Sequence, residues 1–180
     1  MDQAITQWLN SPAGHSPVAD ALMLAATWAG VPVMIGFVAL QWWARTGRSH
    51  VRHACVAAGL SFLLGEGLNQ LILLFVHRPR PYAEGISHLI IAPSPDWSFP
   101  SDHATAAVAI FAAFVLARQG WRSWVVGALA LLVCLSRVYV GTHYVSDVLG
   151  GGLTGLAAAV LVRWGYREGT RLDRMVTGIL

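Results

Sequence analysis

Residues Val18–Ala44 read VADALMLAATWAGVPVMIGFVALQWWA, an apolar run that contains one charged side chain, Asp20. About 20 apolar residues in a helix cross the hydrocarbon core of a bilayer, so this run predicts a membrane-spanning helix that tilts or kinks at Pro32. The whole sequence agrees, because 56% of its 180 residues are hydrophobic and 12% are charged. A soluble domain carries about twice that share of charged residues.

Four further apolar segments reach or approach the length of a span. They cover Val51–Val76, Ser101–Ala117, Trp121–Val140 and Val145–Trp164. Ahead of the first span, residues Met1–Asn10 carry Ile5, Trp8 and Leu9, a pattern typical of a short amphipathic helix at the membrane surface. We therefore predict an all-α fold, a polytopic membrane helical bundle of about five transmembrane helices plus a short N-terminal interfacial helix, in a single domain over residues 1–180.

The distribution of arginine predicts how this bundle lies in the membrane. All twelve basic residues are arginine. With five spans and the N-terminus outside, nine of them fall on the cytoplasmic side, and the outer side keeps Arg78, Arg80 and Arg137. Cytoplasmic segments of membrane proteins carry an excess of basic residues. We therefore expect an outer N-terminus and a cytoplasmic C-terminus.

Three polar clusters fall at span ends on the predicted outer face, where ionisable side chains are costly and usually functional. The long connection His77–Pro100 holds the first cluster and carries five of the eight prolines. The clusters are Arg78-Pro79-Arg80-Pro81-Tyr82, Pro100-Ser101-Asp102-His103, and Ser136-Arg137 followed after five residues by His143 and after three more by Asp147.

These residue types fit phosphoryl transfer from a phosphate ester or anhydride. Asp147 lies four residues after His143, so we expect it to accept the proton of one imidazole nitrogen and leave the other free to attack phosphorus. A phosphohistidine would follow. We expect His103 to protonate the leaving oxygen and later to activate water. The planar forks of Arg80 and Arg137 match phosphate oxygens.

Five other residues complete the predicted arrangement. Ser101 is expected to cap the third span, so that the backbone N–H groups after it point at an anion. Arg78 is either a second phosphate ligand or a solvated side chain. Glu66 lies about 15 Å below the outer end of its span at 1.5 Å per residue, too deep for direct phosphate contact. A protonated, hydrogen-bonded structural role is favoured there over a proton-relay or lipid-binding role. Gly151 and Gly155 form a small-xxx-small pair that predicts close helix packing.

The three clusters together resemble the type-2 phosphatidic acid phosphatase superfamily, whose signature is a basic residue spaced before Arg-Pro, then Pro-Ser-Gly-His, then Ser-Arg-x5-His-x3-Asp. The resemblance covers about residues 69–152 and includes the third motif in full. Within the superfamily, bacterial undecaprenyl-diphosphatases linked to bacitracin resistance are most similar, on the runs Asn69-Gln70-Leu71-Ile72, Arg80-Pro81-Tyr82 and Ser98-Phe99-Pro100-Ser101-Asp102-His103-Ala104-Thr105.

The resemblance implies a role for each motif residue. His143 is then the nucleophile, His103 the acid and base, and Arg80, Ser101 and Arg137 the phosphate ligands, with no metal or cofactor. It further implies dephosphorylation of undecaprenyl diphosphate to undecaprenyl phosphate at the outer leaflet of the bacterial cytoplasmic membrane. That reaction recycles the lipid carrier for peptidoglycan synthesis. The alternative within the superfamily is a phosphatase for phosphatidylglycerophosphate or another lipid phosphate.

Two positions depart from the superfamily pattern. Leu73 stands where the signature has its lysine, so that phosphate contact is missing or is supplied by Arg78. Asp102 replaces the glycine of the second motif, and we expect its carboxylate to point away from the phosphate. The undecaprenyl-type enzymes share both departures, which favours their substrate over phosphatidate.

Other classes of function fit the sequence less well. There is no basic stripe with interleaved aromatic residues for nucleic acid. The two cysteines, Cys55 and Cys134, lie inside apolar runs and indicate neither a disulfide framework nor a metal site. A transporter that uses Arg80 and Arg137 as an anion site would place it near the midplane and show a repeat, and neither is seen. The expected partners are a lipid diphosphate substrate and membrane lipids, and the oligomeric state is left open.

Overall fold

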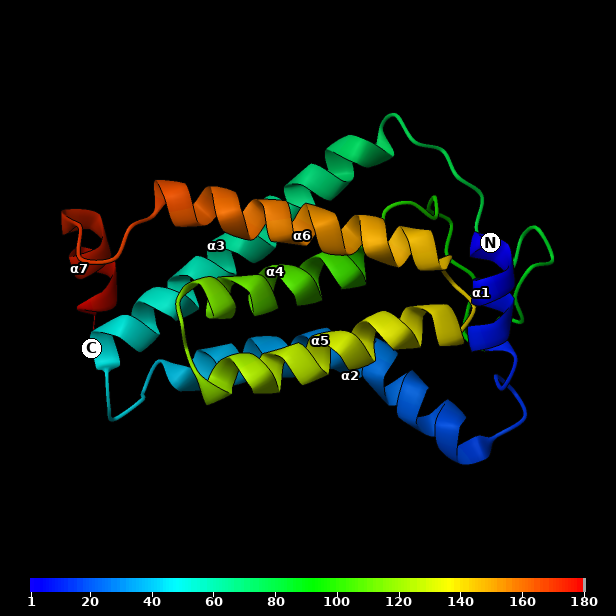
Figure 1. The fold of residues 1–180 in the computed structure, drawn as a ribbon, viewed down its shortest axis with the longest axis horizontal. Helices are drawn as coiled ribbons and strands as arrows, with labels where there is room; N and C mark the ends of the chain where they lie inside the picture. The colour runs from blue at the N-terminus through cyan, green and yellow to red at the C-terminus, as the bar shows by residue number, and fades with distance from the viewer. Residues whose placement is uncertain (180) are drawn as a thin grey trace.

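The computed structural model describes residues 1–179 and folds them into seven helices. Helices α2 to α6 run back and forth along one axis, while α1 and α7 lie across opposite ends of this bundle (Figure 1). The predicted span ends agree with the helix ends within three residues, whereas α7 was not predicted. The helices are α1 (Asp2–Asn10), α2 (Pro17–Gln41), α3 (Arg48–Leu73), α4 (Asp102–Leu116), α5 (Trp121–Tyr139), α6 (Val145–Gly165) and α7 (Arg171–Thr177).

Four helices of the described chain, α2, α3, α5 and α6, are long and apolar enough to cross a membrane. The all-α membrane bundle is therefore confirmed, but α4 falls short of the fifth span that the sequence predicted. Its 15 residues extend roughly 23 Å at 1.5 Å per residue, less than the thickness of a hydrocarbon core. Figure 1 shows the reason: α4 starts further inside the bundle than the neighbouring ends of α5 and α6.

Helix α4 is the centre of the core, and it packs against α2, α3, α5 and α6. Its buried face consists largely of alanines, which let the neighbouring backbones approach. On α6, a Cβ atom added to Gly151 would lie 2.4 Å from the Ser101 carbonyl oxygen, and one added to Gly155 would lie 2.4 Å from the Thr105 carbonyl oxygen. The close packing predicted for this glycine pair is confirmed.

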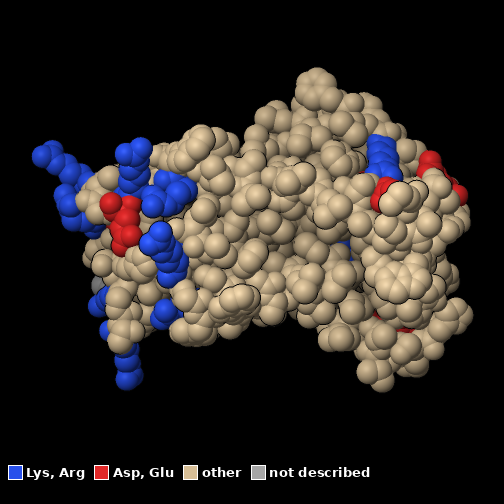
Figure 2. Space-filling view, viewed as in Figure 1, with Lys and Arg blue, Asp and Glu red and all other residues tan. Residues whose placement is uncertain are grey.

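The lateral surface of the bundle is apolar. Large side chains such as Phe75, Trp124 and Leu153 are exposed around the bundle. Figure 2 shows arginines gathered at the end that carries α7 and no charged side chain along the middle of the visible face. Helix α1 is amphipathic, as expected. Its polar face, with Thr6, is buried against the protein, and its apolar face, with Trp8, is exposed. The chain is a multi-pass membrane protein.

Candidate active site

The predicted site residues meet at the end of the bundle that α1 covers. Arg137 lies in the last turn of α5, and His143 lies in the turn that joins α5 to α6. Ser101 and His103 stand at the start of α4, and Arg80 comes from the loop that precedes it. Ser101, His143 and both arginines are buried, although the arginines carry full charge. Buried charges of this kind are held by partners or serve a ligand.

His143 has one ring nitrogen tied to the backbone and the other facing an arginine. Its Nδ1 lies 2.8 Å from the carbonyl oxygen of Ser98, which accepts a hydrogen bond only if Nδ1 carries the proton. Its Nε2 is then unprotonated, and its lone pair accepts a hydrogen bond of 3.2 Å from Nη1 of Arg80. The lone pair needed for nucleophilic attack is therefore on Nε2, beside a cationic donor.

The surroundings of His143 favour its neutral form. Burial lowers the pKa of the imidazole, and the charges of Arg137 and Arg80 lower it further, against the opposing effect of Asp147. A neutral imidazole is the nucleophilic form, so the ring is ready to attack at neutral pH without first losing a proton.

The predicted hydrogen bond between Asp147 and His143 was wrong in its geometry. The Oδ2 of Asp147 lies 3.7 Å from Nδ1 of His143, too far for a hydrogen bond. The reason is that His143 precedes α6, whereas Asp147 sits in its first turn and caps the helix through the backbone N–H of Tyr144, at 2.8 Å. The same Oδ2 accepts a hydrogen bond of 2.5 Å from the hydroxyl of Ser98. Asp147 therefore acts on the imidazole by charge, and Ser98 fixes the tautomer.

Two of the predicted phosphate ligands carry buried polar atoms with no partner in the described part of the chain. These are the Oγ of Ser101 and the Nε of Arg137. Ser101 is the N-cap of α4, as predicted, but its hydroxyl makes no capping hydrogen bond. Arg80 is anchored by the carbonyl oxygens of Asp96 and Thr142, at 2.9 and 3.1 Å. An unpaired buried donor costs stability, which is expected where a ligand supplies the missing acceptor.

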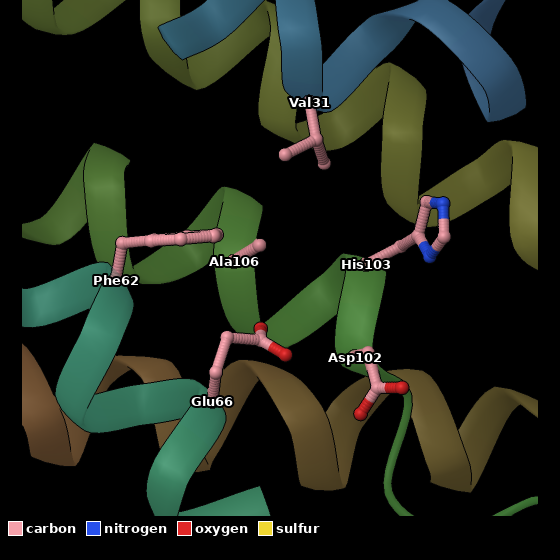
Figure 3. A pocket seen from close by; sticks show the side chains of 6 residues that line it. All are labelled: Val31, Phe62, Glu66, Asp102, His103 and Ala106. Carbon is pink, nitrogen blue, oxygen red and sulfur yellow. The ribbon is translucent and has the colours of Figure 1, made fainter. Parts of the chain in front are cut away.

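A pocket of about 160 Å³ opens beside this centre between α2, α3 and α4. Figure 3 shows His103 and Glu66 on its wall, together with apolar side chains from the three helices. Glu66 thus lies closer to the site than its depth along α3 indicated. The reason is that α4, which carries His103 at its start, begins deep inside the bundle. Asp102 also lines the pocket, and its Oδ1 accepts a hydrogen bond of 2.6 Å from Asn69. His103 lies within electrostatic range of Arg80, Arg137 and His143.

Arg78, predicted as either a second phosphate ligand or a solvated side chain, is paired with two carboxylates in the structure. Its Nη1 donates to Asp147 Oδ1 at 2.7 Å and to Ser146 Oγ at 2.6 Å, and its Nη2 donates to Asp2 Oδ2 at 2.8 Å. The guanidinium also stacks on the ring of Tyr144, 3.8 Å from its centroid. Arg78 therefore contacts Asp147, the carboxylate beside His143.

Residues 54–171 match the PAP2 superfamily. The chain belongs to this superfamily. This PAP2 chain is 33% identical over 162 residues to undecaprenyl-diphosphatase BcrC of Bacillus subtilis, a match that covers 90% of this chain and 80% of that protein. The superfamily resemblance drawn from the motifs is confirmed, and the chain is a lipid phosphatase.

Two solved structures share the fold of this PAP2 phosphatase. One is the transmembrane PAP2 type phosphatidylglycerolphosphate phosphatase from Bacillus subtilis, with a TM-score of 0.69, 25% identity, and coverage of 94% of this chain and 86% of that one. The other is LpxE of Aquifex aeolicus, with a TM-score of 0.72, 20% identity, and coverage of 89% and 93%. The second likeness shows the fold alone.

Sequence reasoning missed two residues of this PAP2 site. Ser98 was quoted within a motif run but given no role, because its contact with His143 runs through a backbone carbonyl that no side-chain pattern reveals. Asp2 lies 145 residues before Asp147 and gave no signal at all. Among residues 1–179 no group of three His, Cys, Asp or Glu side chains is arranged to hold a metal ion. Metal independence stays a prediction.

Proposed function

We propose that this phosphatase removes the terminal phosphate of undecaprenyl diphosphate at the outer leaflet of a bacterial membrane, through a phosphohistidine on His143. The observation that carries the proposal is the unprotonated Nε2 of His143, which accepts a hydrogen bond of 3.2 Å from Arg80 Nη1, in a buried centre with the unpaired donors of Ser101 and Arg137. A phosphate placed between these groups would take over the donor of Arg80 and leave the lone pair of Nε2 to attack phosphorus. Preset donors of this kind stabilise the charge that develops on a transferred phosphoryl group.

In the first step Nε2 of His143 attacks the terminal phosphorus. The N–P bond forms while the bond from phosphorus to the bridging oxygen breaks, and undecaprenyl phosphate leaves with a proton from His103. The ring is cationic in this intermediate because Nδ1 keeps its proton for the carbonyl of Ser98. The carboxylate of Asp147, 3.7 Å away, stabilises that charge by Coulomb attraction.

In the second step water attacks the phosphohistidine and gives its proton to His103. The new O–P bond forms as the N–P bond breaks, inorganic phosphate leaves, and His143 returns to its neutral tautomer. The arginines and the hydroxyl of Ser101 hold the three phosphoryl oxygens in both steps. The pocket bounded by Val31, Phe62 and Ala106 offers apolar contacts to the first units of a lipid tail.

The choice of an undecaprenyl tail rests on the similarity to BcrC of Bacillus subtilis. A second candidate is phosphatidylglycerophosphate, supported by the likeness to the solved phosphatidylglycerolphosphate phosphatase. Both substrates present a terminal phosphate on a lipid, so the chemistry at His143 is the same for both.

Phosphate release by purified protein in detergent tests the proposal. The substrates are undecaprenyl diphosphate, undecaprenyl monophosphate, phosphatidylglycerophosphate and phosphatidate, each with and without excess chelator. We expect the diphosphate to have the highest kcat/KM and chelator to leave it unchanged. His143→Ala should lose turnover by at least a thousand-fold, as loss of a covalent nucleophile does. Turnover by His143→Ala at the wild-type rate would rule out the mechanism, and a preference for phosphatidylglycerophosphate would select the second substrate.

A further inference from the structure

The acid beside the nucleophile is held by residues from distant parts of the chain. Asp147 is fully buried, and its Oδ1 takes its hydrogen bond from Arg78. Its Oδ2 takes one from Ser98 and one from the N–H of Tyr144. Breaking a buried ion pair by removing one partner leaves an uncompensated charge, which is strongly unfavourable. The position and charge of Asp147 therefore depend on Arg78.

Helix α1 in turn holds Arg78. The Oδ2 of Asp2 accepts from Arg78 Nη2 at 2.8 Å and from the hydroxyl of Ser146 at 2.5 Å. Its Oδ1 accepts from the backbone N–H of Ser146 at 3.0 Å, and the hydroxyl of Thr6 accepts from the N–H of Val145 at 3.1 Å. Helix α1 thus caps the start of α6 from outside, one residue away from Asp147.

The charges in this arrangement favour one geometry. Burial raises the pKa of Asp2, but hydrogen bonds from Arg78 and Ser146 outweigh it and leave that pKa below its ordinary value. Asp2 is therefore ionised at neutral pH and pairs with one arm of the Arg78 fork, while Asp147 pairs with the other. The planar guanidinium of Arg78 pairs with a carboxylate at each terminal nitrogen and stacks its face on Tyr144, and these contacts together hold it in one orientation.

We propose that α1 is a brace for the active site, in which Asp2 holds the guanidinium of Arg78 against the carboxylate of Asp147. Asp2 and Arg78 are positioning residues, since they act through Asp147 on His143 and touch no substrate. The inference rests on the proposed phosphohistidine reaction. It assigns a role in the chemical step to a helix that lies outside the membrane bundle, and it replaces the role of Arg78 as a second phosphate ligand.

The brace predicts a loss of kcat with little change in KM. Arg78→Gln removes one charged hydrogen-bonding partner of Asp147, so we expect kcat to fall about ten- to a hundred-fold. Asp2→Ala should lower kcat less, because Arg78 keeps its bond to Asp147. Asp20→Asn is the matched control, since Asp20 is another carboxylate at this end of the bundle that bonds Tyr139 instead. Each variant should lower kcat by the same factor for undecaprenyl diphosphate and for undecaprenyl monophosphate.

The titration of the His143 ring gives a readout that does not depend on turnover. The charged or titratable groups around it are Arg80 in the loop, Arg137 on α5, His103 on α4 and Asp147 on α6. Without Arg78 the negative charge of Asp147 is less compensated, which favours the imidazolium, so the pKa of His143 should rise in Arg78→Gln. Ring signals measured by NMR in detergent, assigned by comparison with His143→Ala, report this pKa directly.

Each outcome decides the matter. A lower kcat at constant KM together with a raised pKa of His143 supports the brace, and Arg78→Lys should then recover part of the rate because it restores the charge. A loss confined to the diphosphate would make Arg78 a ligand of the second phosphate and overturn the brace. The brace would also be overturned if Asp2→Ala and Asp2→Asn had the same kcat as the control Asp20→Asn.

If Arg78→Gln fails to fold, Arg78→Lys and Asp2→Asn carry the same test. If the wild type cleaves no lipid phosphate, the proposed function fails, and the NMR titration still decides the brace.

Discussion

Two buried polar atoms at the centre of the site, Oγ of Ser101 and Nε of Arg137, have no hydrogen-bond partner among residues 1–179. The hydroxyl of Ser101 is fully buried and has no partner in residues 1–179, although it stands at a position where serine usually caps the helix. The hydroxyl of Ser136, equally buried, accepts from Thr27 and donates to the carbonyl of Val133. The hydroxyl of Ser136 therefore has hydrogen-bond partners within the protein, whereas the hydroxyl of Ser101 has none among the described residues.

This difference predicts opposite effects of the same substitution. Ser101→Ala removes an unsatisfied hydroxyl, so the free energy of unfolding should stay the same or rise, while kcat/KM falls about ten-fold for the loss of a phosphate hydrogen bond. Ser136→Ala breaks two hydrogen bonds and should lower the free energy of unfolding by about 1 kcal/mol or more. Thermal unfolding in detergent and phosphate release measure both. A Ser101→Ala protein that is less stable and fully active would show that this hydroxyl serves the fold.

At the scale of elements, the sequence predicted helices α1 to α6 and where their ends fall, because apolar runs and polar motifs alternate sharply along it, but it did not predict α7. It predicted α4 as a fifth span, although α4 is too short for one, and it did not predict that α4 begins deep in the bundle. That depth follows from the path of the loop before it, which buries Ser98 and Arg80. Local pattern carries no information on how far a loop enters a bundle, so the proximity of Glu66 to His103 was not foreseen.

The contact between α4 and α6 makes the spacing of the glycines testable. Alanine in a helix interior is normally more favourable than glycine by about 0.5–1 kcal/mol. At Gly155 a Cβ atom would lie 2.4 Å from the Thr105 carbonyl oxygen and 2.8 Å from the Ala109 nitrogen, so backbone must move. We expect Gly155→Ala to lower the free energy of unfolding by about 1–3 kcal/mol.

Gly152 on the same helix is the matched control for this substitution. A Cβ atom added to Gly152 would lie 3.6 Å from its nearest neighbour, Cγ2 of Val108, which is an ordinary contact. Gly152→Ala should therefore be neutral or slightly stabilising. The two variants should also separate in activity. A shift of α6 against α4 moves Asp147 relative to Ser101, whose N–H donates to the carbonyl of Asp147 at 3.1 Å. Equal stability of the two proteins would mean that the helices separate without cost.

The charges of the whole molecule are divided between its two ends. Nine arginines belong to the helix ends and loops around α7, and three belong to the end with the candidate site. Two of those three, Arg80 and Arg137, are buried, and Arg78 is paired with Asp2 and Asp147. The site end therefore presents little free positive charge to a membrane surface, although it contains three cations. The bias that places basic residues in the cytoplasm thus favours a cytoplasmic α7 and an outer active site.

Labelling of single cysteines tests this orientation. On a background of Cys55→Ala and Cys134→Ala, cysteines replace two exposed residues, Ala83 in the loop beside the site and Thr46 between α2 and α3. No side-chain hydrogen bond is lost at Ala83, whereas the neighbouring Glu84 accepts one from Tyr144. A membrane-impermeant thiol reagent should label Ala83→Cys in intact cells and Thr46→Cys only after lysis. The reverse pattern would place the site in the cytoplasm, where it could serve only lipids of the inner leaflet. The isolated enzyme would be equally active in either orientation, so assays in detergent do not distinguish the two. Cysteine labelling does, and it decides whether the proposed reaction at His143 could take place at the outer leaflet.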